Sequence, residues 1–288
     1  MKQTRGMVAV LISLVLCSCL SASLAQEMPK PVVEAVEAVG MTVGDMDRSI
    51  AFYSDAYLAA TVTAAAVATH HDVKAFINMS QLTRSQMSLT ETTASPQHKL
   101  HWLAAQALNG SGLPVVHVRP TVLLEGFFLM FTADSLRASK QIRLPFGEGK
   151  TSPVAVEDVA RVIAARRAHP PPHLGKIDHR TGPQSETMHV YAQESSKALG
   201  RTITFPDIPV EPWRDGLLER GWPGHLVNHL ATMAALHRAG RSDRMSDDVL
   251  LLTGQGPLSV PEIVRKHAAT CTASASHAGE EEEKIWHI

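Results

Sequence analysis

Two histidines, His225 and His229, are four residues apart, a spacing that suits a chemical role. His225 and His229 would share one face of a helix, as two zinc-binding imidazoles do. A zinc-dependent hydrolase also needs a glutamate directly after the first histidine, and Leu226 stands there. No third ligand suggests itself among the 15 histidines, so we interpret the pair as structural.

Other polar clusters also fall short of a reactive motif. The run Gly147-Glu148-Gly149-Lys150 is not a phosphate-binding loop, because its first glycine, its spacing and its Ser/Thr partner are wrong. We interpret His98, His101 and the His70-His71-Asp72 turn as exposed polar residues. None of these clusters predicts a metal site.

Ser80 is a stronger candidate, because it follows the apolar segment 73–79. That segment is rich in β-branched and aromatic residues and predicts a buried parallel strand. Ligands bind outside the carboxyl ends of such strands, which places Ser80 at a binding edge. The alternative is a serine that hydrogen-bonds its own backbone.

The surrounding pattern predicts the elements that would position this serine. Ser95 and Pro96 supply the N-cap and first turn of a helix that Asn109-Gly110 ends. A further apolar strand follows at residues 113–118, and strand, helix and strand at this spacing form a right-handed crossover. After Gly149 the pattern is mostly helical. We therefore predict an α/β fold: a partial doubly wound (Rossmann-like) parallel sheet with a helical C-terminal substrate region.

Composition limits the class of protein further. The 288 residues carry 27 Lys+Arg against 28 Asp+Glu, so the net charge of -1 gives no case for a nucleic-acid partner. Hydrophobic residues make up 44%, which is ordinary for a globular chain. Three cysteines cannot form a disulfide framework.

The first 25 residues have the pattern of an export signal. Lys2 and Arg5 precede a short apolar run, and Ser23 and Ala25 supply small residues for cleavage. The run is too short for a membrane span. Lipidation at Cys19 is an alternative. The expected location is periplasmic or secreted if the signal is used, and cytoplasmic otherwise.

Residues 26–56 predict a short strand and helix. The string TVGDMDRSIAFY resembles the opening of a vicinal oxygen chelate (glyoxalase/dioxygenase) module. The superfamily's first metal ligand would fall near Ala38, which has no donor atom. No second unit of this kind follows, so metal-dependent chemistry does not carry over.

The longer segment 57–271 carries a second resemblance. The strings FINMSQLTRSQMSLTETTASPQHKLHWLAAQALNGSGLPVVHVRPTVLLEGFF and LPFGEGKTSPVAVEDVARVIAA stand in this part, with ITFPDIPVEPWRDGL further on. They resemble the NmrA-like NAD(P)-binding proteins, atypical short-chain dehydrogenases/reductases with quinone- and azo-reductase-like members. Residues 272–288 form a charged tail.

This resemblance implies roles for individual residues. Ser80 would face the nicotinamide, and Lys99 would hydrogen-bond the nicotinamide ribose. Ser95 stands where a standard short-chain reductase has its tyrosine, so acid catalysis by a Tyr–Lys pair is not supported. Arg119, Pro120 and Thr121 end the next strand and would form a floor beside the nicotinamide. The alternative for Pro120 is a structural one, since proline ends a strand ladder. The substrate mouth would be lined by Glu125, Phe127 and Phe128.

One expected part of such a protein is missing. Glycines let the backbone approach a dinucleotide pyrophosphate, but residues 1–109 contain only Gly6, Gly40 and Gly44. The resemblance implies an NAD(P)H-dependent reductase of a small-molecule acceptor. The alternatives are a non-catalytic remnant or sensor that lost dinucleotide binding and, less favoured, a vicinal oxygen chelate metalloenzyme.

Overall fold

A parallel sheet forms the centre of the structure. The computed structural model describes residues 9–11, 46–71, 73–82, 87–91, 93–126, 131–168 and 177–272. Within them the strand order is β1-β2-β3-β4, and each neighbouring pair is parallel. The strands are β1 (Ala9–Leu11), β2 (Phe76–Met79), β3 (Val115–Pro120) and β4 (Ile177–Arg180). The predicted α/β class and parallel sheet are confirmed.

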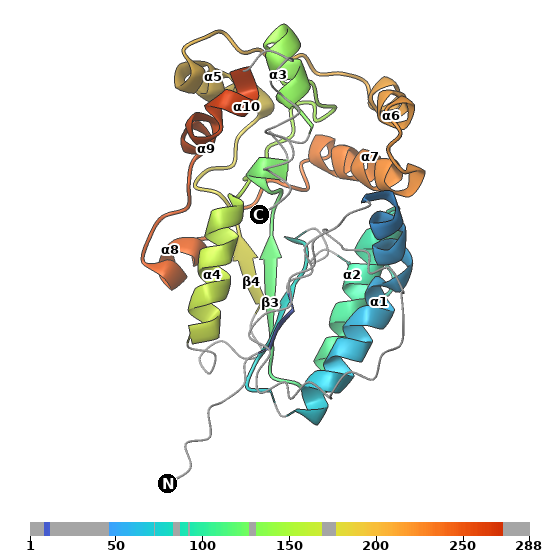
Figure 1. The fold of residues 1–288 in the computed structure, drawn as a ribbon. Coiled ribbons are helices and arrows are strands. Elements are labelled where there is room, and N and C mark those ends of the chain that lie inside the picture. The colour runs from blue at the N-terminus through green and yellow to red at the C-terminus, as the bar shows by residue number, and fades with distance from the viewer. Residues whose placement is uncertain are drawn as a thin grey trace, which may run out of the picture.

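Helices cover both faces of this sheet (Figure 1). On one face lie α1 (Met46–His70) and α2 (Pro96–Gly110), and on the other lies α4 (Val156–Ala168). Side chains alternate along each strand, so each strand serves both layers. Phe76 and Val115 pack with Ala65 of α1, whereas Ile77 and Val116 belong to the core that includes Val159 of α4.

A second, mostly helical region lies beyond the end of the sheet toward which β3 points (Figure 1). Its core includes Leu136, Ile142, Tyr191, Phe205 and Ile263, all buried. The helices after β3, apart from α4, are α3 (Ala133–Ser139), α5 (Met188–Leu199), α6 (Val210–Glu219), α7 (Gly224–Arg238), α8 (Asp248–Thr253), α9 (Val260–Lys266) and α10 (Ala268–Thr272). α8 contacts β4 and α4 beside the sheet.

Helix ends follow ordinary capping chemistry, and the start of α2 lies where the sequence predicted it. The Ser95 hydroxyl accepts the backbone N–H of His98 at 3.4 Å and begins α2. Gly200 ends α5 in the left-handed region, with φ 64°. Ser259 and Glu262 form a capping box at α9. Local sequence therefore determines these boundaries.

Two features of the N-terminal part were not predicted. α1 runs without a break across the expected boundary between residues 56 and 57. Residues 9–11, inside the expected signal peptide, pair with Phe76, Ile77 and Asn78 as strand β1. The short strand expected before residue 44 and the charged tail beyond Thr272 lie outside the described residues. The described sheet thus includes β1, a strand that the sequence did not predict.

The C-terminal end of α7 is held closely by a loop. The ring of Phe146 stacks on that of His237 with centroids 4.1 Å apart. Asp207 accepts the N–H of Gly147 at 3.0 Å and forms two bonds to Arg238, at 2.7 and 2.8 Å. A Cβ added to Gly149 would lie 1.8 Å from the His237 carbonyl oxygen. No larger residue fits at this contact without displacing backbone.

Candidate functional site

The carboxyl ends of β2, β3 and β4 bring a row of polar side chains to one face of the sheet. Asn78 and His117 are paired in the register, and their side chains are hydrogen-bonded at 3.0 Å. His117 also bonds Asn109 of α2 at 2.8 Å, so this row faces α2. Two residues further along, the same alternation places Ser80 and Arg119 on the α2 face.

The Ser80 side chain is buried and has no partner. Only 3% of the residue is exposed, and its hydroxyl makes no hydrogen bond among the described residues. Its backbone N–H donates to the Val118 carbonyl at 2.8 Å. The reading of Ser80 as a serine that caps its own backbone is therefore wrong. A buried hydroxyl without a partner costs free energy, which favours a role in binding.

Arg119 lies beside Ser80 and is also buried, at 8% exposure. Its Nε has no partner among the described residues. Burial lowers the pKa of the guanidinium to about 10, because a charge away from water is disfavoured. The resemblance placed Arg119 with Pro120 and Thr121 in the floor beside the nicotinamide, but the sequence did not predict that its charge is buried. A charged residue at the end of an apolar strand was the available signal.

The next strand continues the row with His179, and Arg180 follows it with its side chain on the other face of the sheet. His179 pairs in register with Arg119, and burial followed by the Arg119 charge lowers the pKa of His179. Arg180 is completely buried and forms an ion pair with Asp248 at 3.0 Å. The same carboxylate accepts the His179 N–H at 2.8 Å. Positive charge is thus concentrated at this edge of the sheet, and Asp248 offsets part of it.

Pro120 and Thr121 lie at the end of β3, as the sequence predicted, but Thr121 is already engaged. Its N–H donates to the Arg180 carbonyl at 2.9 Å, and its hydroxyl donates to the Ser152 carbonyl at 2.5 Å. Pro120 is buried. Both hydrogen bonds of Thr121 hold the end of β3 against neighbouring segments.

Lys99 projects from the first turn of α2 and is exposed. A helix that connects two parallel strands runs antiparallel to them, so its first turn lies at their carboxyl ends. The structure therefore brings Lys99 to the same end of the sheet as Ser80 and Arg119. No ion pair or hydrogen bond of its ammonium group is found in the part of the chain that the structure describes.

Ser95 and the nearby histidines form a buried cluster between α2 and α7. The Ser95 hydroxyl lies 2.7 Å from Nδ1 of His229. Nδ1 of His98 is hydrogen-bonded to the Thr93 hydroxyl at 2.9 Å. The rings of His98 and His229 are packed edge to face, with their centroids 4.9 Å apart. The prediction that His98 is exposed is wrong, because its exposure is 0%. Packing of α7 over the first turn of α2 removes it from water.

Burial keeps these histidines neutral. It lowers the pKa of His98 to about 4, and that of His229 well below the usual value, with the nearby His98 and His101 adding to the effect. Residues 46–71, 73–82, 87–91, 93–126, 131–168 and 177–272 contain no group of three metal-ligating side chains. The interpretation of His229 as structural matches its bond to Ser95.

The expected substrate residues are only partly placed. Glu125 is half-buried, and its carboxylate accepts the N–H of Val156 at 2.9 Å, which caps α4. That contact already gives Glu125 a structural task. Phe127 and Phe128 lie outside the described residues.

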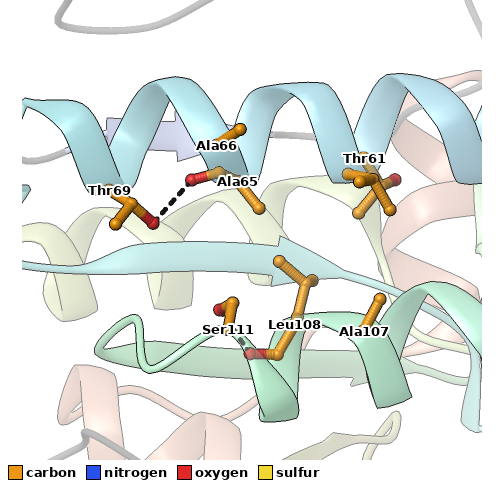
Figure 2. Close-up of a pocket in the computed structure, with 8 residues that line it drawn as sticks. Thr61, Ala65, Ala66, Thr69, Ala107, Leu108 and Ser111 are labelled. Atoms are coloured by element: carbon orange, nitrogen blue, oxygen red, sulfur yellow. Dashed lines mark hydrogen bonds between the residues drawn. The ribbon is translucent and has the colours of Figure 1, made fainter.

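Two hollows occur elsewhere on the molecule. A groove of about 210 Å³ lies between α1 and α2 (Figure 2). There the hydroxyls of Thr69 and Ser111 bond backbone carbonyls of Ala65 and Leu108, so the groove offers mainly apolar contact. A second hollow of about 300 Å³ lies between α3 and α6. Neither includes Ser80 or Arg119 in its lining.

No family model matches the chain. Among curated proteins, NAD(P)H azoreductase of Xenophilus azovorans is 27% identical over 182 residues, which are 62% of this chain and 63% of that protein. Agroclavine dehydrogenase of Claviceps fusiformis is 28% identical over 156 residues, 53% of each chain. The chain thus spans between half and two thirds of the length of these relatives.

Solved structures show the same fold. The triphenylmethane reductase of Citrobacter sp. superposes with a TM-score of 0.63 at 18% identity, covering 74% of this chain and 71% of that one. An NADPH-dependent quinone oxidoreductase of Escherichia coli gives 0.62 at 19% identity, with 78% and 82% covered. NmrA, a negative transcriptional regulator solved with NAD, gives 0.59 at 14% identity, with 82% and 75% covered. In fold and in sequence this chain resembles the NmrA-like NAD(P)-binding proteins.

Proposed function

We propose that the protein is an NAD(P)H-dependent reductase of quinone- or azo-type small-molecule acceptors. One observation carries the proposal: unpartnered donors gather at the carboxyl ends of a parallel sheet that resembles those of known reductases. Solved relatives were crystallised with NADP(H) or NAD, and a curated relative is a NAD(P)H azoreductase.

The residues present fit the nicotinamide end of such a cofactor. The unpartnered Ser80 hydroxyl can accept and donate a hydrogen bond to a carboxamide. The Lys99 ammonium group is available to a ribose hydroxyl. When bound, NAD(P)H would supply the hydride that reduces the acceptor.

Proton supply differs from that of a Tyr–Lys reductase. The Ser95 hydroxyl accepts the N–H of His98 and is hydrogen-bonded to Nδ1 of His229, so it is engaged within the fold. A hydroxyl committed in this way, with a high intrinsic pKa, is a poor general acid near neutral pH. We infer that solvent protonates the reduced acceptor and that Ser95 holds the first turn of α2, which carries Lys99.

A second candidate is a non-catalytic binding or sensor protein. It is favoured by the absence of a glycine-rich turn from residues 1–109, and by the commitment of Ser95 to His229. NmrA itself is a negative transcriptional regulator solved with NAD. A protein of this kind either binds the dinucleotide or has lost that ability, and in both cases it reduces no acceptor. The two candidates therefore differ in whether the protein catalyses reduction of an acceptor.

A fluorescence titration of NADPH into the purified chain tests the proposal. We expect micromolar binding, weakened about tenfold in Lys99→Ala, because a hydrogen bond to a charged group contributes roughly 1.5–3 kcal/mol. Lys74→Ala is the matched control, since Lys74 is exposed just before β2, at the opposite end of the sheet.

Quinone-dependent oxidation of NADPH then separates the candidates. Binding with turnover supports the reductase. Binding without turnover of any of a panel of quinones and azo dyes favours the sensor. A folded chain that neither binds nor oxidises NADPH would overturn the reductase proposal.

A further inference from the structure

Arg119 is a buried positive charge without a counter-ion among the residues that the structure describes. It is 8% exposed, its Nε has no partner, and no ion pair or hydrogen bond of its side chain occurs among the described residues. Arg180, one strand away, shows the contrast. It is buried as well, but it pairs with Asp248 at 3.0 Å.

An unpaired buried charge is costly, because water that solvated it has been replaced by a less polar environment. Folded proteins usually pair such a group or place it where a ligand completes the pair. Arg119 lies at the carboxyl end of a central strand, where ligands of parallel sheets bind. Its position thus favours a ligand as the missing partner.

The surroundings of Arg119 favour an anion. Ser80 stands beside it on the neighbouring strand with an unpartnered hydroxyl. The positive end of the α2 dipole and Lys99 lie at the same end of the sheet, and the first turn of α2 has no acidic residue. On the other side, His179 is held toward its neutral form by burial and by the Arg119 charge itself. Asp248 is engaged by Arg180 and by the backbone of His179.

We propose that Arg119 and Ser80 bind an anionic oxygen group, a carboxylate, sulfonate or phosphate, on the molecule that occupies this end of the sheet. The guanidinium supplies the positive charge and N–H donors, and the Ser80 hydroxyl adds an O–H donor. The group belongs either to the acceptor or to the dinucleotide. The proposal deepens the proposed function and rests on it for the placement of the ligand.

Two azo dyes that differ by one carboxylate test the acceptor as the source. Methyl red carries a carboxylate, and 4-dimethylaminoazobenzene is the same dye without it. Binding of each dye to the full chain is measured by absorbance titration without NADPH, so the result does not depend on turnover. NADPH is titrated separately. The variants are Arg119→Met and Ser80→Ala, with Arg265→Met as the control, because Arg265 is exposed on α9.

We expect the unmodified chain to bind methyl red at least tenfold more tightly than the uncharged dye. Arg119→Met should abolish that preference, Ser80→Ala should reduce it several-fold, and Arg265→Met should leave it unchanged. If instead only NADPH binding falls tenfold in Arg119→Met, the anion is a phosphate of the dinucleotide, which also supports the proposal. Unchanged binding of both dyes and of NADPH in a folded Arg119→Met chain would overturn it.

Thermal unfolding of the same variants distinguishes the loss of a ligand contact from a loss of binding caused by unfolding. Removal of an unpaired buried charge should leave the melting temperature unchanged or raise it, whereas a structural arginine would lower it. Arg119→Gln replaces Arg119→Met if the latter fails to fold. Failure of the proposed function looks different: NADPH would not be oxidised, while the dye preference and its dependence on Arg119 would persist.

Discussion

The hydroxyl of Ser95 and Nδ1 of His229 lie 2.7 Å apart, although 134 positions separate them in the chain. The bond joins the N-cap of α2 to the middle of α7 in a buried setting. It connects the parallel sheet and its crossover helix to the helical C-terminal region. The orientation of Lys99, one turn into α2, therefore depends on a residue far away in the sequence.

Loss of this bond should destabilise the fold. We expect Ser95→Ala to cost about 1–3 kcal/mol, because it removes a helix cap and leaves a buried imidazole nitrogen without a partner. Urea unfolding measures the change. A double-mutant cycle with His229→Phe isolates the pair, and additive effects of the two substitutions would contradict the coupling.

Acid should weaken the fold through the buried histidines. Burial lowers the pKa of His98 and of His237 to about 4 from 6.5. Below pH 6.5 the unfolded chain takes up protons that these folded residues do not, so stability is full above that pH and is lost as pH falls toward 4. Each histidine accounts for at most about 3 kcal/mol.

Urea unfolding at pH 7.5, 5.5 and 4.5 measures this loss. The decrease of the free energy of unfolding between pH 7.5 and pH 4.5 should become smaller in His98→Asn. His70→Gln is the control, since His70 is exposed. The same dependence of the free energy of unfolding on pH in His98→Asn as in the unmodified chain would show that other groups cause the loss of stability in acid.

Gly149 should be intolerant of any side chain. A Cβ would lie 1.8 Å from the His237 carbonyl, so Gly149→Ala must displace the loop or the end of α7. We expect a loss of roughly 2 kcal/mol or more in urea unfolding. Gly216→Ala in α6, where nothing lies within 4 Å, should be stabilising by up to about 1 kcal/mol. Equal effects of the two substitutions would contradict the close contact.

Residues 9–11 form strand β1 in the fold, but they also lie in the segment that export would remove. We propose that the signal is used and that cleavage follows Ala25. N-terminal sequencing of secreted protein should then begin at Gln26. Cleavage would remove β1 and expose the edge of β2, so the cleaved chain should be less stable than the full chain. A secreted chain that retains residues 9–11 would contradict the cleavage.

Local sequence was enough for much of the fold. The ends of α2 were predicted from Ser95-Pro96 and Asn109-Gly110. Strands β2 and β3 were predicted from continuous apolar segments, which are typical of buried parallel strands. β1 was missed because an apolar run inside a signal-like segment does not distinguish a strand from an export signal. The division at residue 56 fell inside α1, since a resemblance in sequence carries no information on where a helix ends.

The site was less predictable. Ser80 directly follows β2, as the apolar run before it predicted, whereas the roles of Ser80 and Lys99 toward a nicotinamide stay predictions. His98 was expected on the surface, and its burial depends on contact with α7, which local patterns do not encode. Arg119 was expected only as part of the floor beside the nicotinamide, because the burial of its charge and the lack of a partner for its Nε are properties of the packed structure.

The order of the described strands has one more consequence. In a full doubly wound sheet the order reverses once, and the dinucleotide lies across the crevice at that reversal, with one nucleotide on each half. Here the strands follow one another as β1-β2-β3-β4, and every crossover moves in the same direction. Among the described strands a ligand therefore meets one half-site.

The adenosine part of a dinucleotide should then contribute little to affinity. We expect reduced nicotinamide mononucleotide to bind within a few-fold of NADPH, measured by the same fluorescence titration. A hundredfold weaker mononucleotide would show that residues outside the described strands hold the adenosine. A sheet of this kind would recognise its cofactor by the nicotinamide mononucleotide half alone.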